Sequence, residues 1–158
     1  MPRPPVMERT GLVYLQGFFD AAPDSLWHPA AMNRADCPFC QPLPQERILA
    51  ESDIFIAFFD GYPVSEGHAL VIPKRHVASL FDLPEPEFQE IWAQVAAIRR
   101  LLAERFHPAG FNIGVNDGRA AGQTIGHAHI HIIPRYEGDV PDPRGGVRWV
   151  IPAKAKYW

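Results

Sequence analysis

Three histidines stand at every second position between residues 127 and 131, within the apolar run HAHIHII. Side chains of a β-strand alternate between its two faces, so a strand here places His127, His129 and His131 on one face and apolar residues on the other. The apolar face suits a protein core, and the imidazoles would then line a surface. Neighbouring histidines start only about 7 Å apart on such a face. The pattern therefore predicts a strand whose row of ionisable rings serves a chemical purpose or binds a metal.

The rest of the chain supplies the partners for this strand. Between residues 85 and 107, apolar residues recur at steps of three and four, which predicts one long amphipathic helix. Short apolar runs bounded by turn residues predict further strands at residues 47–52, 54–59, 68–73 and 111–116. We therefore expect an α+β fold, with an antiparallel sheet of about five strands and one long helix packed on it.

Net charge and the length of apolar runs limit the classes of partner and the location that we expect for this chain. The chain of 158 residues carries a formal net charge of −3, which gives no field that would attract nucleic acid in general. No apolar run approaches the length of a membrane span, and the first ten residues lack the apolar stretch of a secretion signal. We expect a cytoplasmic protein that binds neither membranes nor nucleic acid.

Two interpretations of the histidine row follow from its chemistry. The row could be a metal cage, because imidazole is a common metal ligand. Alternatively, one ring is a nucleophile and its neighbours orient it and bind the charge of a substrate. The preceding segment favours the nucleophile: glycines at 118 and 122 let backbone N–H groups approach an anion, and neutral donors follow from the side chains of Asn116, Gln123 and Thr124.

The two cysteines form the motif CPFC, with Cys37 and Cys40 at the spacing of a zinc knuckle or of a redox pair. A redox pair needs the motif at the start of a helix, which lowers the thiol pKa. Pro42 and Pro44 follow at once and would interrupt such a helix. A structural disulfide is disfavoured in the cytoplasm. Zinc needs two further ligands, and redox or inert thiols stay open as alternatives.

Residues 116–135, NDGRAAGQTIGHAHIHIIPR, resemble the signature of the histidine triad (HIT) family of nucleotide hydrolases and transferases. The upstream segment FFDGYPVSEGHALVIPKRH resembles the strand–turn–strand segment of the same family. The resemblance covers residues 37–136 and implies a HIT-like catalytic domain there. Residues 1–36 would form an N-terminal extension, with a short helix at residues 24–32, and residues 137–158 a C-terminal tail that packs on the domain.

The resemblance also implies roles for single residues. His129 would attack the α-phosphate of a nucleotide and form a covalent nucleotidyl-histidine, while His131 would contact the phosphate and steady its charge. Asp60 would bind the ribose hydroxyls, although a plain turn role is an alternative for an Asp-Gly pair. The other substrate-binding residues implied are Gln123 and Thr124 at the phosphate and leaving group, Asn116 beside them, and Phe59 or its apolar neighbours at the base.

Bacterial members of this family that carry the cysteine pair complete a zinc site with two histidines, which match His76 and His127. Two thiolates and two neutral imidazoles would form a closed, structural Zn²⁺ site with Cys37 and Cys40. A ring bound to zinc cannot attack phosphorus, so His127 would anchor the strand and leave His129 free. His68 matches a further family histidine behind the active site, where a structural hydrogen bond is an equal interpretation.

The bacterial branch that this resemblance indicates hydrolyses diadenosine polyphosphates, and its members are homodimers. Our main hypothesis is therefore a nucleotide hydrolase of this kind. A nucleoside phosphoramidase or a nucleotidyl transferase would keep the same chemistry and change the leaving group or acceptor. A low-turnover, zinc-stabilised nucleotide-binding module belongs to another class. A metal-dependent oxygenase is disfavoured, because no carboxylate ligand follows the histidines at the required spacing.

Overall fold

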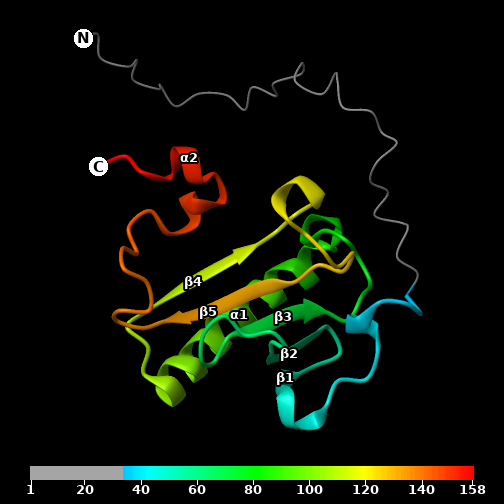
Figure 1. Ribbon diagram of the computed structural model, residues 1–158. Coiled ribbons are helices and arrows are strands. Elements are labelled where there is room, and N and C mark those ends of the chain that lie inside the picture. Colours follow the sequence, from blue (N-terminus) through cyan, green and yellow to red (C-terminus); the bar gives the residue numbers. More distant parts are fainter. Residues whose placement is uncertain (1–33) are drawn as a thin grey trace, which may run out of the picture.

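One mixed sheet-and-helix unit is built from residues 34–158, the part of the chain that the computed structural model describes (Figure 1). The expected helix at residues 24–32 lies outside this range. The sheet consists of β1 (Ile48–Glu51), β2 (Phe55–Phe59), β3 (Ala69–Pro73), β4 (Gly110–Val115) and β5 (Ile130–Arg135). Its spatial order is β1-β2-β3-β5-β4, with every neighbouring pair antiparallel. The expected α+β fold is confirmed.

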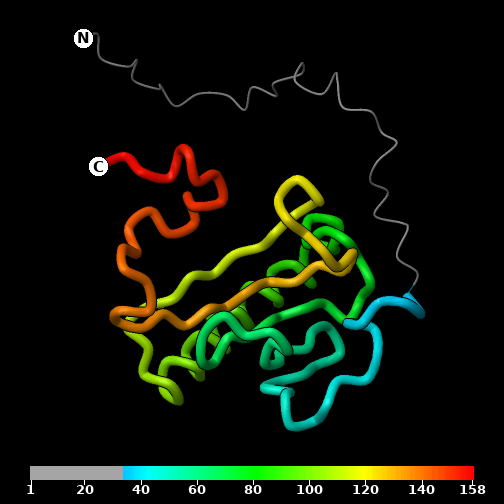
Figure 2. The backbone as a smooth tube through the Cα atoms, viewed as in Figure 1, coloured from blue at the N-terminus to red at the C-terminus, as the bar shows by residue number. Residues whose placement is uncertain are grey.

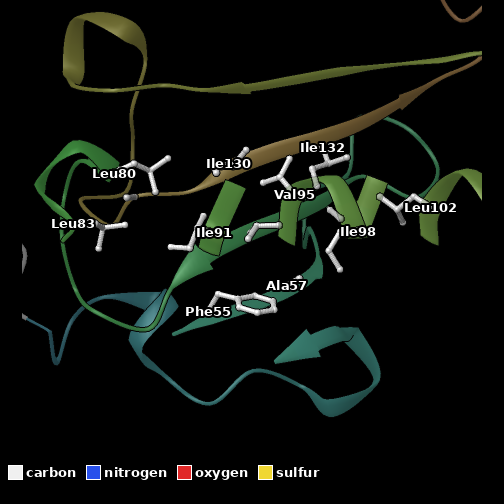
Figure 3. Packing of buried hydrophobic residues seen from close by; sticks show 13 residues of the cluster. Phe55, Ala57, Leu80, Leu83, Ile91, Val95, Ile98, Leu102, Ile130 and Ile132 are labelled. Atoms are coloured by element: carbon white, nitrogen blue, oxygen red, sulfur yellow. The ribbon is translucent and has the colours of Figure 1, made fainter. Parts of the chain in front are cut away.

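The helix α1 (Glu85–Phe106) covers one face of this sheet and packs on β3 and β5. Its buried side chains, Ile91, Val95, Ile98 and Leu102, follow the predicted steps of three and four. Figure 3 shows them in one layer with Ile130 and Ile132 of β5 and with Phe55 and Ala57 of β2. Burial of each such side chain contributes about 1.5–3 kcal/mol, so this layer helps to hold β5 in place.

Strand β5 begins later than the histidine pattern predicts. The ladder between β3 and β5 ends at the pair Val71–Ile130, and its continuation would pair Ala128 with Pro73. Proline has no N–H to extend a ladder, and the Ala128 N–H donates to the carbonyl of Val77 instead. His127 and His129 therefore precede the strand, and only His131 lies within it.

The alternation of faces nevertheless holds along residues 127–132. Ala128, Ile130 and Ile132 belong to the core under α1, and the histidines face the other way. The expectation that the rings line a surface is wrong for His127, which is 1% exposed, whereas His129 is 6% exposed and lines a cavity. The segment around residue 40, which lies beside the start of β5 in Figure 2, covers them.

The C-terminal tail folds largely on itself. Its 3₁₀ turn (Gly146–Val150) contacts α2 (Pro152–Ala155), and the Arg148 guanidinium donates to the carbonyls of Lys154 and Ala155. Figure 1 shows this segment beyond the edge strand β4, away from the helix. None of the helices within residues 34–158 combines the length and apolar character needed to cross a bilayer.

Candidate functional site

His129 is held in one tautomer. Its Nδ1 lies 2.8 Å from the backbone carbonyl oxygen of His127. A carbonyl can only accept a hydrogen bond, so Nδ1 carries the proton and a neutral ring keeps its lone pair on Nε2. The ring lines a cavity of about 500 Å³ on the sheet face opposite α1. The arrangement leaves Nε2 as the nitrogen with a lone pair, the atom that a nucleophilic histidine uses, in a ring that lines the cavity.

This cavity has an apolar wall and a polar rim. The wall consists of Phe39, Leu43, Phe58 and Leu70. Arg47, Asp60, Thr124 and His131 supply the polar groups. An apolar enclosure with a few converging polar groups is the usual form of a small-molecule site.

His131 belongs to a hydrogen-bonded chain that leads away from the cavity. Its Nδ1 lies 3.0 Å from Nε2 of His68. The Val64 N–H donates to Nδ1 of His68 at 3.3 Å, which places the His68 proton on Nε2 and directs it to His131. Nε2 of His131 then carries the remaining proton as a donor. His68 thus has the hydrogen-bonded role behind the site that was one of its two interpretations.

Burial keeps His131 uncharged. Loss of solvent, followed by the repulsion of a charge on His129 or His68, lowers the pKa of His131 to about 4. Burial also lowers the pKa of His68, although Asp60 opposes the shift. At neutral pH both rings are therefore neutral, and His131 donates one hydrogen bond without bringing a full charge into the cavity.

Asp60 has the turn role considered for it and also lies at the rim of the cavity. Its Oδ1 accepts the Tyr62 N–H at 3.0 Å, which is the turn expected of an Asp-Gly pair. Its Oδ2 lies 3.4 Å from Nδ1 of His68, and the residue also lines the cavity. The carboxylate is thus fixed by the turn and held at the rim.

Some predicted site residues lie elsewhere. Gln123 is 8% exposed, and its amide donates to the Ala78 carbonyl and accepts the Gly118 N–H, so both ends hold the preceding loop in place. Thr124, its neighbour, does line the cavity. Asn116, one residue beyond β4, is not among the lining residues.

Phe58 lines the cavity, and Phe59 does not. Phe59 points to the opposite face of β2, where it packs edge-on against Phe106 of α1 with ring centroids 5.9 Å apart. Adjacent residues of a strand face opposite sides, so a one-residue difference decides which ring enters the cavity. The apolar-neighbour form of the prediction fits Phe58.

Sequence reasoning missed several lining residues, and two of them, Phe39 and Arg47, make specific contacts. The ring of Phe39, between the two cysteines, lies edge-on to His129 with centroids 5.3 Å apart and also contacts His127. Its position next to the predicted metal ligands was the available signal. Arg47 donates twice to the carbonyl of Phe59 and lies over the Phe58 ring. Nothing in the local sequence distinguished this arginine from a solvated one.

The four predicted metal ligands converge at the end of the cavity. Cys37, Cys40, His76 and His127 place one ligand atom each within 4.8 Å of all the others. The Nδ1 atom of His127 is 3.4 Å from the Cys37 sulfur and 3.5 Å from the Cys40 sulfur, and His76 Nδ1 is 3.2 Å from the latter. Tetrahedral Zn²⁺ separates such S and N atoms by roughly 3.6 Å. The four residues therefore fit a zinc ion.

The surroundings of this cluster also match a metal centre. Nε2 of His127 lies 2.8 Å from the carbonyl oxygen of Pro73, so it donates there and leaves the Nδ1 lone pair directed at the sulfurs. Metal-bound histidines commonly make such a second hydrogen bond. CPFC begins a 3₁₀ turn of three residues rather than an α-helix, and burial raises the pKa of the Cys40 thiol. Both features disfavour the redox alternative, which needs a lowered thiol pKa.

The fold and site define a class of protein in which an antiparallel sheet, backed by one helix, carries a row of three histidines, the last two of which line a cavity. The chain belongs to the HIT domain family, whose profile matches residues 42–138, well over half of its length. The cysteine pair lies just before the matched range.

Among its relatives is an adenylylsulfatase, HINT3, from Arabidopsis thaliana, which is 39% identical over 107 residues. A bis(5'-adenosyl)-triphosphatase from Dictyostelium discoideum is 39% identical over 95 residues. The matches cover 66% and 60% of this chain, but only 54% and 64% of the two relatives. The crystal structure of a HIT family protein from Bacillus subtilis superimposes with a TM-score of 0.62 at 34% identity, covering 66% of this chain and 76% of that one.

Proposed function

We propose that this protein is a nucleotide hydrolase that cleaves diadenosine polyphosphates or related nucleotides at the α-phosphate through a covalent intermediate on His129. The observation that carries the proposal is the tautomer of His129, a ring that lines the cavity: the His127 carbonyl holds the Nδ1 proton and leaves Nε2 as the nitrogen with the lone pair. The names of the two relatives, an adenylylsulfatase and a bis(5'-adenosyl)-triphosphatase, support this reaction class.

The first step forms the intermediate. Nε2 of His129 attacks the α-phosphorus, and a P–N bond forms as the bond to the bridging oxygen breaks. The leaving nucleotide takes the electron pair of the broken bond. His131 donates its Nε2 hydrogen to a phosphate oxygen on which charge builds, and the Thr124 hydroxyl is placed to donate beside it.

The second step regenerates the enzyme. Water attacks the same phosphorus, the P–N bond breaks, and a nucleoside monophosphate leaves as the water proton passes to solvent. The base packs on the Phe58 and Phe39 wall, and the fixed carboxylate of Asp60 accepts from the ribose hydroxyls. Gln123 acts as a positioning residue, because it holds the loop that leads to Thr124.

The four-residue cluster would hold a structural Zn²⁺ through Cys37, Cys40, His76 and His127. Such a closed site supplies no reaction step. Its contribution is to fix the backbone of His127, whose carbonyl orients the His129 ring. Reduced cysteines of this kind fit a reducing compartment such as the cytoplasm.

We also propose that the protein is a homodimer. Strand β4 stands at the edge of the sheet, and its six residues are all half-buried within this chain. An edge strand leaves a row of unpaired backbone groups that a second copy can satisfy. Size measurement in solution tests this, since a monomer at micromolar concentration would contradict it.

Turnover assays test the proposed activity. Purified protein is incubated with diadenosine tetraphosphate and, separately, with adenosine 5'-phosphoramidate. We expect hydrolysis of the first, with release of adenosine monophosphate and abolition in His129→Ala. Hydrolysis of the phosphoramidate alone would establish a phosphoramidase. Nucleotide binding without turnover of either compound would establish the binding module and refute the hydrolase.

A further inference from the structure

A second cavity lies beside the first on the open face of the sheet. It measures about 450 Å³ and is lined by residues of the β2–β3 loop, β4, β5 and the segment after β5, among them Val64, Ser65, Asn112, Ile133 and Val140. None of these residues lines the first cavity. Ile133 shares its strand face with His131, two residues away, so the second cavity begins roughly 7 Å from that ring.

A strip of bare backbone joins the two cavities. Gly114 of β4 is paired with His131 of β5, so their side-chain positions share the open face. A Cβ atom at Gly114 would meet nothing within 4 Å. The next pair along the two strands on this face is Asn112 with Ile133, in the wall of the second cavity. An extended ligand can therefore leave His131, cross Gly114 and reach that cavity without a side chain in its path (the strands are side by side in Figure 1).

The second cavity is lined mainly by apolar surface and offers no unpaired cation within residues 34–158. The Arg135 guanidinium donates to both carboxylate oxygens of Asp139 and to Oδ1 of Asn112. The remaining charge in the lining is that of Glu66. A phosphate group would meet only acidic or neutralised groups here, so the cavity suits an uncharged ligand.

Two neutral polar residues, Ser65 and Asn112, line the second cavity. The Ser65 hydroxyl oxygen is buried and makes no hydrogen bond within residues 34–158. Asn112 uses its oxygen for Arg135, which leaves the two Nδ2 hydrogens without a partner in the same part of the chain. Asn112 is half-buried and lines the cavity, so its Nδ2 hydrogens can donate to a polar group of a bound ligand. With Val64, Ile133 and Val140 as apolar walls, the lining matches a nucleoside.

We propose that the second cavity holds the leaving nucleoside of a dinucleoside polyphosphate while its phosphate chain crosses Gly114. This inference rests on the proposed function and names the part of the substrate that His129 does not retain. When the P–N bond forms at His129 and the bridging P–O bond breaks, the departing nucleotide leaves from this cavity. A compound with a small leaving group makes no use of it.

Two substitutions close this route without touching the first cavity. Gly114→Val places a branched side chain on the bare strip, at a position whose backbone is ordinary strand, and Ile133→Trp fills the second cavity. We expect each to lower kcat/KM for diadenosine tetraphosphate roughly tenfold or more, which is the effect of losing one good contact region. Hydrolysis of adenosine 5'-phosphoramidate should stay within about twofold of the parent.

The matched control is Gly110→Val, on the same strand and face and with equally open space, but outside the lining of the second cavity. It should leave both substrates unaffected. Equal losses for both substrates in Gly114→Val, or unchanged hydrolysis of the dinucleotide in both variants, would overturn the proposal.

A binding measurement separates this proposal from the reaction itself. Calorimetry on His129→Ala compares diadenosine tetraphosphate with adenosine monophosphate. We expect the dinucleotide to bind roughly tenfold more tightly, and Gly114→Val to remove that advantage. Equal affinity for the two ligands would refute the second subsite even if the protein hydrolyses the dinucleotide. A retained difference, lost in Gly114→Val, would support it even if turnover were absent.

Discussion

His127 and His129 are two residues apart and equally hidden from solvent, yet they differ in what remains free on each ring. His127 uses both nitrogens, one toward the Pro73 carbonyl and one toward the cysteine sulfurs. His129 uses Nδ1 alone. The proposed roles follow this difference: the ring with both nitrogens engaged would be the anchor, and the ring with one nitrogen spare would be the reactive group. Burial by itself does not separate these roles.

The largest expected effect comes from removing the spare nitrogen. His129→Ala should lower hydrolysis of diadenosine tetraphosphate by roughly a thousandfold or more, because loss of a nucleophile removes the intermediate. Steady-state kinetics measure the change. His107→Ala, at the exposed end of α1, is the control and should retain full activity. Near-normal turnover in His129→Ala would assign the attack to another group.

Removing a ligand from the proposed metal site should mainly lower the unfolding free energy. Cys40→Ser removes one of the four ligands, and we expect bound zinc to disappear and the unfolding free energy to fall by about 4 kcal/mol or more. Metal analysis and denaturant unfolding measure the two quantities. A chelator should destabilise the parent strongly and the variant hardly at all. Equal stability of parent and variant, with no zinc in either, would contradict the metal centre.

A smaller effect concerns the neutral state of His131. Its folded-state pKa of about 4 lies below the ordinary 6.5, so between these values the unfolded chain binds a proton that the folded protein does not. The unfolding free energy should therefore fall as pH is lowered from 6.5 to 4, by up to about 3 kcal/mol from this residue.

Denaturant unfolding of the parent and of His131→Asn at several pH values checks this sign and size. The variant should show a flatter decline. Both proteins keep the four metal ligands, so acid release of a metal cancels in the comparison. Parallel curves for the two proteins would show that His131 is not buried in its neutral form.

The smallest expected effect concerns the contact between the proposed metal site and the proposed nucleophile. Phe39 contacts both His127 and His129, so Phe39→Leu should lower activity roughly tenfold through looser positioning of the nucleophile. Its zinc content should be unchanged. Phe81→Leu, at a side chain that is 71% exposed, should alter neither. Loss of zinc in Phe39→Leu would show that this ring supports the anchor rather than the reactive histidine.

The spacing of apolar residues and the positions of turn residues predicted most of the fold, because both depend only on residues close together in the sequence. The three- and four-residue steps of α1 and the alternation of Ala128, Ile130 and Ile132 appear in the structure as expected. Local reasoning failed where a distant group decides the outcome. Pro73 ends the ladder that residues 127–129 would continue, and the segment around Phe39 covers rings that the pattern alone places on a surface.

The residues of the candidate site also differ in whether local sequence or a distant group decides their placement. The convergence of Cys37, Cys40, His76 and His127 was predicted through the family resemblance, because motif positions carry over residue by residue. Phe59 was placed one residue off, since alternation in β2 could be counted only once its partners were known. Gln123 has a polar side chain of the right type, but its two bonds to Gly118 and Ala78 depend on the path of a loop.

The central claim is that Nε2 of His129 bonds to phosphorus. Rapid acid or cold quenching of the protein with diadenosine tetraphosphate, followed by proteolysis and mass spectrometry, tests it most directly. We predict an adenylyl adduct on the peptide that contains residues 127–131, assigned to His129 by fragmentation and absent from His129→Ala. An adduct on His131, or efficient hydrolysis by direct attack of water with no trapped species, would contradict the account.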